Sequence, residues 1–207
     1  MGFYTRRLLP GLLHVAMRQP MLAPYRRRIA GAAEGRVLEV GIGSGLNLGH
    51  YGLSVTEVVG VEPSSALLDR AREAATRAPI RAELVEGSAE ALPLESASFD
   101  TVVTTWMLCT IPDAVRALDE MRRVLKPGGS LLFVEHGRAP EPGVARWQDR
   151  LDPLWTRLAG ACHLNRPITD LVADGGFRID MLTTSRVPGP RTHTFHDGED
   201  GEQQHVG

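Results

Sequence analysis

The sequence has few cysteines and no long apolar run, and both absences narrow what the chain can be. Cys109 and Cys162 are too few for a disulfide framework, so we expect reduced thiols and a cytoplasmic protein. No stretch reaches the roughly 18 uninterrupted apolar residues that a membrane-spanning helix requires. Residues 1–20 lack the basic, apolar and small-residue order of a secretion signal, so we expect no export.

Clustered metal ligands are also absent from the sequence. Cys162 and His163 are adjacent, but no further ligands follow at the spacing of a zinc motif. We therefore expect no metal site, and we expect Cys162 to be buried and unreactive. With 207 residues, of which 43% are hydrophobic and 23% charged, the chain can bury a core without disulfide or metal support.

Acidic residues are scarce near the N-terminus, although the whole chain carries a net charge of −2. Residues 1–36 contain seven arginines against the single acid Glu34, which gives this stretch about +6 and leaves about −8 for the rest. Apolar residues between Leu8 and Met17 fit one helical face. Two roles are open for this arm: a lid over a binding cleft, or a helix in peripheral contact with an anionic membrane.

Short apolar runs alternate with helical patterns through the middle of the chain. The expected strands are Arg36–Val40, Glu57–Val61, Arg81–Val85, Asp100–Thr104 and Ser130–Glu135. The expected helices are a stretch directly after Gly45, Ser64–Ala78 and Asp113–Leu125, the last of which ends at Lys126-Pro127-Gly128-Gly129. This alternation predicts an α/β fold with a doubly wound, mostly parallel sheet.

The pattern weakens after His136. Residues 147–158 and 168–174 have the pattern of helices, and residues 177–183 that of a late strand. We therefore divide the chain into a helical arm (1–30), one α/β domain (31–188) and a polar, glycine-rich tail (189–207) that we expect to be flexible.

Alternating glycines follow the first expected strand, in the segment Glu39-Val40-Gly41-Ile42-Gly43-Ser44-Gly45. Glycine lets the backbone turn tightly and lets a ligand approach the main chain. In an open parallel sheet, ligands bind beyond the carboxyl ends of the strands, where free N–H groups at a helix start favour a carboxylate. Because Glu39 adds a partner for an ammonium group, the turn suits the zwitterionic end of an amino acid.

Two further strand ends carry groups that suit a nucleoside. Glu62 closes the second expected strand, where a carboxylate can accept hydrogen bonds from both ribose hydroxyls. The loop at residues 87–93 offers backbone N–H groups and a short polar side chain that can flank an adenine. A nicotinamide enzyme is the competing interpretation, but its fingerprint is G-x-G-x-x-G, whereas the spacing here is G-x-G-x-G after an acid.

From about Arg36 to His136, the chain resembles the class I S-adenosylmethionine (SAM)-dependent methyltransferases. RVLEVGIGSG is similar to their first motif, VVGVEPS to their second, EGSAEALPLESASFDTVV to their adenine loop and fourth strand, and EMRRVLKPGGSLLFVEH to their helix and fifth strand. The resemblance implies SAM as cofactor, with Glu39 and the glycines at its methionine part, Glu62 at the ribose, and Ser88 and Ala89 at the adenine. The full set of expected cofactor contacts is Glu39, Gly41, Gly43, Gly45, Asn47, Glu62, Pro63, Ser88, Ala89, Glu90, Thr105 and Trp106. Many relatives have aspartate in place of Ser88.

Within that class, the chain resembles the small-molecule branch of quinone C-methyltransferases and thiol S-methyltransferases. The runs LCTIPD (108–113), FVEH (133–136) and LDPLW…GACHLNR (151–166) are similar to the thiol group, while the two histidines that quinone enzymes often have after strand four are replaced by cysteine and threonine. The resemblance implies methyl transfer to a small, apolar acceptor, with a thiol or sulfide favoured. C- or O-methylation of a quinone and N-methylation of a phospholipid amine are the alternatives.

A soft, anionic nucleophile needs little acid–base help, because the enzyme mainly aligns the reactants and excludes water. His136 is our candidate for a catalytic base or a substrate contact, with a structural hydrogen bond as the alternative. Further residues are expected to lie near the acceptor, with core packing or a surface salt bridge as alternatives: Met107, Cys109, His163 and Arg166, together with the pocket-lining candidates Trp106, Trp147 and Trp155.

Other functions are less consistent with the sequence. A non-catalytic binding module predicts a degraded cofactor turn, yet Glu39, the glycines and Glu62 are intact. A methyltransferase acting on amino groups of nucleic-acid bases usually has an asparagine- or aspartate-proline-proline-aromatic motif after strand four, where Trp106-Met107-Leu108 stands here. We therefore expect a small-molecule substrate and no nucleic-acid partner, and make no prediction of the oligomeric state.

Overall fold

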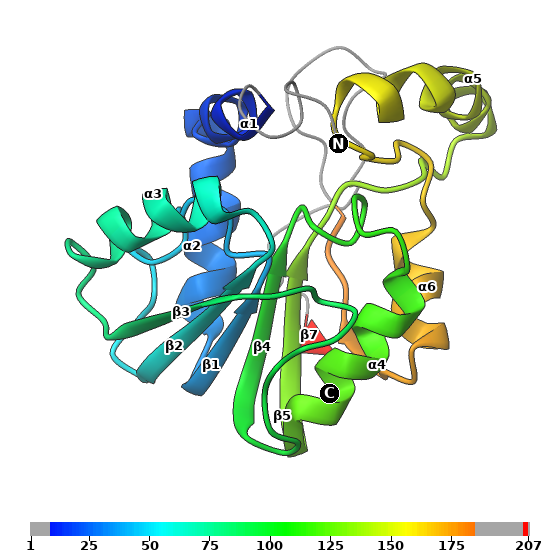
Figure 1. The fold of residues 1–207 in the computed structure, drawn as a ribbon. Helices are drawn as coiled ribbons and strands as arrows, with labels where there is room; N and C mark the ends of the chain where they lie inside the picture. The colour runs from blue at the N-terminus through cyan, green and yellow to red at the C-terminus, as the bar shows by residue number, and fades with distance from the viewer. Residues whose placement is uncertain (1–8, 185–204, 207) are drawn as a thin grey trace.

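The computed structural model describes residues 9–184 and 205–206, which form one seven-stranded sheet with helices on both faces (Figure 1). The strands are β1 (Gly35–Val40), β2 (Val55–Glu62), β3 (Ala82–Glu86), β4 (Phe99–Thr105), β5 (Leu125–Val134), β6 (Ile179–Met181) and β7 (His205–Val206). The helices are α1 (Leu9–Met17), the 3-10 helix η2 (Pro20–Leu22), α2 (Ala23–Ala32), α3 (Ser65–Ala75), α4 (Ala114–Val124), α5 (Pro142–Leu158) and α6 (Ile168–Asp174). The strand order is β3-β2-β1-β4-β5-β7-β6.

The sheet is parallel from β3 through β5, and β7 is antiparallel to both β5 and β6. Along β1, Val37 packs with core residues of α2 and α3, whereas Leu38 packs with those of α4 and α6. Successive side chains of a strand point to opposite faces, so helices on both faces explain the nearly continuous apolar runs. The predicted doubly wound, mostly parallel α/β sheet is confirmed.

The path of the chain through the sheet reverses between β1 and β4. From β1 the chain adds β2 and β3 on one side, then crosses back to place β4 on the other side of β1. In doubly wound sheets, ligands bind at this switch point, beyond the carboxyl ends of the two central strands. Figure 1 shows α1 and α5 over the same edge of the sheet.

Four elements differ from their predicted form. α5 begins at Pro142, five residues before its predicted start, because a proline suits the first turn of a helix. The stretch after Gly45 forms successive turns instead of a helix; Gly49 and Gly52 disfavour a helix there. β5 begins at Leu125 because that residue already pairs with Phe99, before an irregularity in the register. The late strand is limited to Ile179–Met181, because Phe177 is buried in the core at the end of α6.

The predicted helical arm is present as α1, η2 and α2, and Ile29 and Ala30 of α2 are part of the core. The predicted flexible tail falls largely on residues 185–204 and 207, which lie outside the described residues. Its residues 205–206 instead form β7, between β5 and β6. Among the residues that the structure describes, no helix combines the length and apolarity needed to cross a membrane.

Candidate functional site

The glycine turn after β1 has the unusual backbone that its sequence predicts. Gly41, Gly43 and Gly45 have φ angles of 71°, 57° and 75°, a region that other residues rarely adopt. A Cβ on Gly41 would lie 2.5 Å from Met107 Cγ, and one on Gly45 would lie 3.0 Å from Ala74 Cβ. A Cβ on Gly43 would meet nothing closer than a backbone oxygen at 3.9 Å. Gly43 is therefore the glycine at which a ligand can approach the main chain.

Glu62, at the end of β2, points toward this turn. Its Oε2 accepts a hydrogen bond from the Gly43 N–H at 3.1 Å, and its Oε1 accepts one from the Ser64 N–H at 3.0 Å. Burial raises the pKa of the Glu62 carboxyl, and the two backbone donors oppose that effect. The carboxylate is thus fixed beside the turn, with lone pairs left to accept further hydrogen bonds.

Glu39, the last acid of β1, is buried in a polar network. Its Oε1 accepts a hydrogen bond from Asn47 Nδ2 at 2.8 Å, and its Oε2 accepts one from the Tyr51 hydroxyl at 2.7 Å. Burial raises the pKa of Glu39 to about 7, although both hydrogen bonds and the Arg26 charge oppose the rise. Asn47 also donates to Thr105 Oγ1 at 3.2 Å, which joins the network to the end of β4.

Arg26 of α2 brings a buried positive charge into the same network. Its Nη1 donates to Asn47 Oδ1 at 3.0 Å, and its guanidinium lies 4.7 Å from the centre of the Trp106 ring. Trp106 has a φ of 52°, which is rare for an aromatic residue. Backbone strain of this kind concentrates at functional sites.

The N-terminal arm contacts the turn at a second point. His14 of α1 shares a hydrogen bond of 2.7 Å with Ser44 Oγ, between the second and third glycines. Burial, together with nearby Arg70 and Arg18, lowers the pKa of His14. The arm therefore packs against the candidate cofactor site through both α1 and α2.

The expected adenine loop after β3 is held by its own side chains. Ser88 Oγ accepts a hydrogen bond from the Glu90 N–H and contacts Glu90 Oε2, both at 3.2 Å. Glu90 Oε1 accepts from the Asp113 N–H at 2.8 Å, which ties the loop to the start of α4. Ala89 packs against the core.

The loop after β4 is organised by Glu135, which the sequence analysis did not single out. This buried carboxylate accepts hydrogen bonds from three consecutive N–H groups, at 2.7 Å from Met107, 2.8 Å from Leu108 and 3.4 Å from Cys109. Burial raises the pKa of Glu135, and the three donors oppose that effect. The sequence signal was available, since Glu135 is the acid that closes an apolar strand directly before His136.

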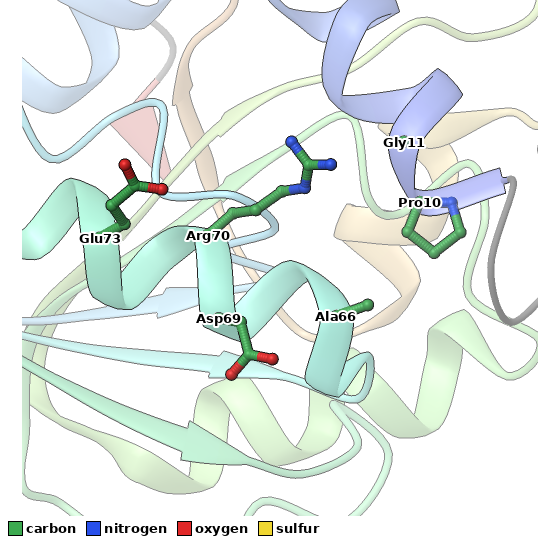
Figure 2. A pocket seen from close by; sticks show the side chains of 6 residues that line it. All are labelled: Pro10, Gly11, Ala66, Asp69, Arg70 and Glu73. Carbon is green, nitrogen blue, oxygen red and sulfur yellow. The ribbon is translucent and has the colours of Figure 1, made fainter.

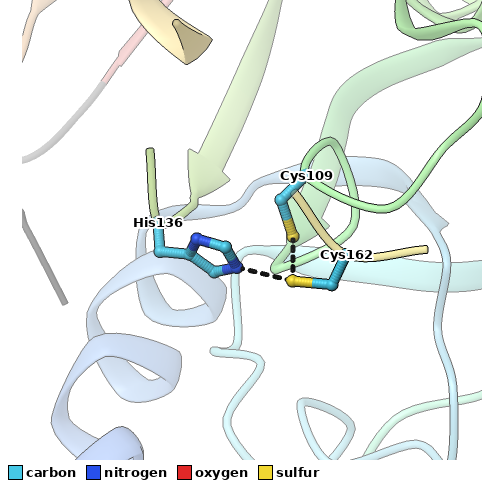
Figure 3. A group of neighbouring side chains, drawn as sticks. All are labelled: Cys109, His136 and Cys162. Carbon is cyan, nitrogen blue, oxygen red and sulfur yellow. Dashed lines mark hydrogen bonds between the residues drawn. The ribbon is translucent and has the colours of Figure 1, made fainter. Parts of the chain in front are cut away.

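His136 and both cysteines lie together at this edge (Figure 3). His136 Nε2 is 3.0 Å from Cys162 Sγ, which lies 3.8 Å from Cys109 Sγ. Cys109 is buried, whereas Cys162 and His136 are partly exposed. Cys162 was expected to be buried, but it is half-buried, and its sulfur contacts a histidine and a second thiol. The Cys109 thiol and burial raise the pKa of Cys162, which is consistent with the expected low reactivity.

The remaining acceptor candidates have structural partners. His163 Nδ1 bonds Asp152 Oδ2 at 2.9 Å. Arg166 Nη1 donates to the carbonyls of Leu108 and Ile111, each at 2.6 Å, and so braces the loop after β4. Among residues 9–184 and 205–206 it has no acidic partner of the kind that a surface salt bridge requires. Trp147 is 55% exposed, which contradicts its expected place in an apolar pocket.

A separate hollow of about 490 Å³ lies between α1 and α3 (Figure 2). It is lined by Pro10, Gly11, Ala66, Asp69, Arg70 and Glu73. None of these is an expected cofactor contact, and Asp69 is already paired with Arg72. We assign no chemistry to this hollow.

The residues at the switch point fit SAM. A Cβ on Gly43 would meet only a backbone oxygen at 3.9 Å, so a ligand has room at its main chain, and Glu62 has lone pairs left for the hydroxyls of a ribose. Glu39 lies beside the turn but is buried, with both oxygens accepting hydrogen bonds from Asn47 and Tyr51. The Glu62 carboxylate lies against the glycine turn, as a cofactor bound across both strand ends requires. Glu39, Asn47, Glu62 and Thr105 are all buried and thus held in place.

Comparisons with known proteins agree with this geometry. Residues 38–133 match the model of the methyltransferase domain family. The chain is 36% identical over 141 residues to a phosphatidylethanolamine N-methyltransferase of Cereibacter sphaeroides, covering 62% of this chain and 68% of that protein. It is 34% identical over 133 residues to the rat thiol S-methyltransferase TMT1B, covering 63% of this chain and 54% of the relative. The chain thus spans about half the length of the rat relative.

A solved SAM-dependent methyltransferase from Thermotoga maritima has the same fold, with a TM-score of 0.62, 21% identity and coverage of 98% of this chain and 96% of that one. The matched family segment runs from β1 to β5 and so includes the glycine turn, Glu62 and the loop after β4. The chain belongs to the class I SAM-dependent methyltransferases, whose cofactor is SAM.

Proposed function

We propose that this chain transfers a methyl group from SAM to a small, apolar acceptor, and that a thiol or sulfide is the favoured acceptor. The observation that supports SAM binding most directly is the hydrogen bond from Gly43 N–H to Glu62 Oε2. It places an acid for the ribose against a turn whose backbone a ligand can reach. This pair lies at the switch point of the sheet, where a nucleoside ligand is expected.

In this proposal the cofactor is bound by residues from four segments. Glu39, the three glycines and Asn47 bind the amino-acid end, and Glu62 with Pro63 binds the ribose. Ser88, Ala89 and Glu90 flank the adenine, and Thr105 with Trp106 closes the pocket. When bound, SAM supplies an electrophilic methyl group on a sulfonium; the residues of the chain orient the acceptor and exclude water.

Two observations support a thiol acceptor. The rat relative is named a thiol S-methyltransferase. Glu135, the acid that contacts the loop after β4, accepts three backbone hydrogen bonds and is therefore not free to act as a strong base. A thiol with an ordinary pKa of about 8.5 is partly ionised at neutral pH and needs no strong base. His136, whose ring lies near Cys109 and Cys162, is the proposed base or acceptor contact. Met107, Cys109, His163 and Arg166 are the other residues proposed to lie near the acceptor; the His163 N–H and the Arg166 guanidinium donate to carbonyls of the loop after β4.

Quinones and phospholipid amines are the alternative acceptors. The relative from Cereibacter sphaeroides is named a phosphatidylethanolamine N-methyltransferase. We propose incubating the protein with labelled SAM and separate panels of alkyl thiols, quinols and phosphatidylethanolamine vesicles. Label transfer to thiols supports the proposal, whereas transfer to a quinol or an amine alone overturns the acceptor assignment.

Calorimetry tests the cofactor separately from the acceptor. We expect saturable binding of SAM and of its demethylated product, and no binding of NADH. Absence of binding by both sulfur compounds overturns the cofactor proposal, and tight NADH binding supports the nicotinamide alternative.

For the N-terminal arm we propose one of two roles: contact with an anionic membrane surface, or a lid over the cofactor site. α1 exposes Leu12 (57%) and Val15 (70%), next to the basic residues of the arm. Such a helix suits an anionic membrane surface, whereas the His14 contact with Ser44 suits a lid. Co-sedimentation of the protein with anionic but not with neutral vesicles supports membrane contact, provided that the double variant Leu12→Ser/Val15→Ser no longer sediments. If the same amount of protein sediments with and without vesicles, membrane contact is overturned and the lid role is retained.

A further inference from the structure

Three side chains that commonly bind metals converge from distant parts of the chain: Cys109 after β4, His136 after β5 and Cys162 after α5 (Figure 3). Their ligand atoms all lie within 4.8 Å of one another. The expectation of no metal site considered residues close in sequence, whereas Cys162 is 53 positions from Cys109 and 26 from His136. The fold therefore creates a ligand set that sequence spacing does not reveal.

The spacing of the two sulfurs matches tetrahedral coordination. Zinc binds thiolate sulfur at about 2.3 Å, so two such ligands of a tetrahedral ion lie about 3.8 Å apart. The sulfurs of Cys109 and Cys162 are 3.8 Å apart. Histidine nitrogen binds zinc at about 2.0 Å, which corresponds to a nitrogen–sulfur distance of about 3.5 Å. His136 Nε2, at 3.0 Å from Cys162 Sγ, therefore has to withdraw by about 0.5 Å from that sulfur.

The backbone around the cluster is fixed by contacts that do not depend on a metal. The Glu135 carboxylate accepts hydrogen bonds from the N–H groups of Cys109 and of the two residues before it. The carbonyl of Cys109 accepts a hydrogen bond from the His163 N–H at 2.8 Å, which joins the two cysteine-bearing loops. Arg138 N–H donates to the Arg166 carbonyl at 2.9 Å, which joins the segment after β5 to the same loop. A preorganised frame of this kind is what a binding site needs.

We propose that Cys109, Cys162 and His136 bind a thiophilic divalent metal ion, with zinc as the expected occupant and one coordination position open. Three protein ligands with an open fourth position are typical of catalytic zinc sites. Cys109 is buried, whereas His136 and Cys162 are half-buried, so the cluster lies near the surface and an ion can reach it. Each thiol releases its proton to solvent when it binds the metal.

In the metal-bound protein His136 is a ligand and not a base, and the open position gives the metal a role that rests on the proposed function. A thiol that coordinates a zinc ion loses its proton, so the fourth position can hold a thiol acceptor as the thiolate. The metal site itself does not require this role and stands if the acceptor is a different compound.

Cobalt substitution tests the site, because thiolate ligands give Co²⁺ a near-ultraviolet charge-transfer band that histidine and carboxylate ligands do not. The chain has two cysteines, so such a band has to come from this pair. We expect the reduced full-length protein, kept in a phosphine reductant, to bind one Co²⁺ with this band and to lose it to stoichiometric Zn²⁺. Addition of a simple alkyl thiol should intensify the band if the fourth position is open.

Three variants and one control complete the test. Cys109→Ser and Cys162→Ser should each weaken the band and lower Co²⁺ affinity at least tenfold, about the smallest loss expected even for an outer-shell partner. His136→Asn keeps both thiols and should lower the affinity while preserving part of the band. His50→Asn removes a histidine outside the cluster and should change nothing.

Circular dichroism establishes whether each variant is folded. If the cysteine variants do not fold, His136→Asn alone provides the test, because it keeps both cysteines. Absence of a thiolate band in the reduced wild type overturns the metal site. The site is also overturned if Cys109 and Cys162 are isolated as a disulfide and the protein still binds no Co²⁺ once that disulfide has been reduced. Failure of methyl transfer to thiols in the presence of the band overturns the acceptor proposal alone.

Discussion

At the level of single residues, Gly43 and Gly45 share a left-handed backbone but have different surroundings. A Cβ on Gly45 would lie 3.0 Å from both Ala74 and Leu48, whereas one on Gly43 would make only an ordinary contact of 3.9 Å with a backbone oxygen. Gly45→Ala should therefore destabilise the fold by about 3 kcal/mol, from backbone strain and overpacking together. Gly43→Ala should cost about 1–2 kcal/mol, from backbone strain alone.

The Gly43→Ala and Gly45→Ala variants also separate an effect on SAM binding from an effect on fold stability. Gly43→Ala places a methyl group where the cofactor approaches, so we expect its SAM affinity to fall at least about tenfold, or 1.4 kcal/mol. Urea unfolding and calorimetry on both variants measure the two effects. Equal stability losses would contradict the difference in packing around the two glycines. Unchanged SAM affinity in Gly43→Ala would show that the cofactor does not lie against this residue.

Glu39 predicts a pH dependence of stability. Burial raises its pKa from 4.5 to about 7, so between these values the folded protein keeps a proton that the unfolded chain has lost. The free energy of unfolding therefore falls as pH rises through this window and levels off above it. At 1.36 kcal/mol per pKa unit, the contribution of Glu39 amounts to about 3 kcal/mol.

Glu39→Gln isolates that contribution. Glutamine can still accept from Asn47 through its oxygen and donate to the Tyr51 oxygen through its amide, but it cannot ionise. Relative to wild type, the variant should become about 3 kcal/mol more stable as pH rises from 4.5 to 7, measured by urea unfolding at several pH values. Parallel stability curves for the two proteins would show that the folded Glu39 has an ordinary pKa.

At the level of elements, Arg26 provides the polar link between α2 and the candidate cofactor site, beside the apolar packing of Ile29 and Ala30. Arg26 is buried against Trp106 and Asn47, while its neighbour Arg27 is exposed on the same helix. Arg26→Ala leaves Asn47 Oδ1 without its buried donor and should cost about 1–3 kcal/mol. Arg27→Ala should change stability by less than about 0.5 kcal/mol.

Limited proteolysis reports the consequence for the arm. Loss of the Arg26 contacts should make the peptide bonds between α1 and α2 cleave faster, because cleavage requires local opening. SAM binding should weaken in the same variant, since Trp106 and Asn47 lose their positioning partner. Identical cleavage of the Arg26 and Arg27 variants would place the arm's attachment elsewhere.

The central elements were predictable because their sequence patterns carry the physics directly. β1, β2 and β4 are short β-branched runs covered on both faces, and α6 matches its predicted bounds. The turns after Gly45 were mistaken for a helix, because the segment's conformation depends on Asn47 and Tyr51 bonding to Glu39 on another element. β7 was missed because its pairing partners, β5 and β6, lie far away in sequence.

The candidate site divides in the same way. Glu62 and the glycines follow strand ends, so the sheet itself determines that they meet. Arg26, Glu135 and the approach of Cys162 to Cys109 depend on how three loops and an arm fold over the edge, which local patterns do not encode. The side chains at the acceptor end were therefore named from the sequence, but their partners were not.

At the level of the whole molecule, the cofactor should act as a bridge between strands. β1 provides the turn and β2 provides Glu62, so SAM bound to both stabilises the folded state and not the unfolded chain. A ligand at 100 times its dissociation constant adds about 2.7 kcal/mol to the free energy of unfolding. We expect saturating SAM to raise the thermal midpoint of the wild type accordingly.

Two variants of β2 decide whether that stabilisation passes through Glu62. Glu62→Ala removes the carboxylate that faces the turn and should abolish most of the SAM-induced shift. Glu57→Ala removes an acid near the opposite end of the same strand, where it pairs with Arg36, and should leave the shift intact while lowering the midpoint slightly. The measurement is a thermal scan of the three proteins at one fixed SAM concentration. The concentration has to be the same for all three, because scaling it to each dissociation constant would give every protein the same shift. An undiminished shift in Glu62→Ala would mean that the cofactor is held by other strand ends, and the assignment of this edge as the SAM site would be wrong.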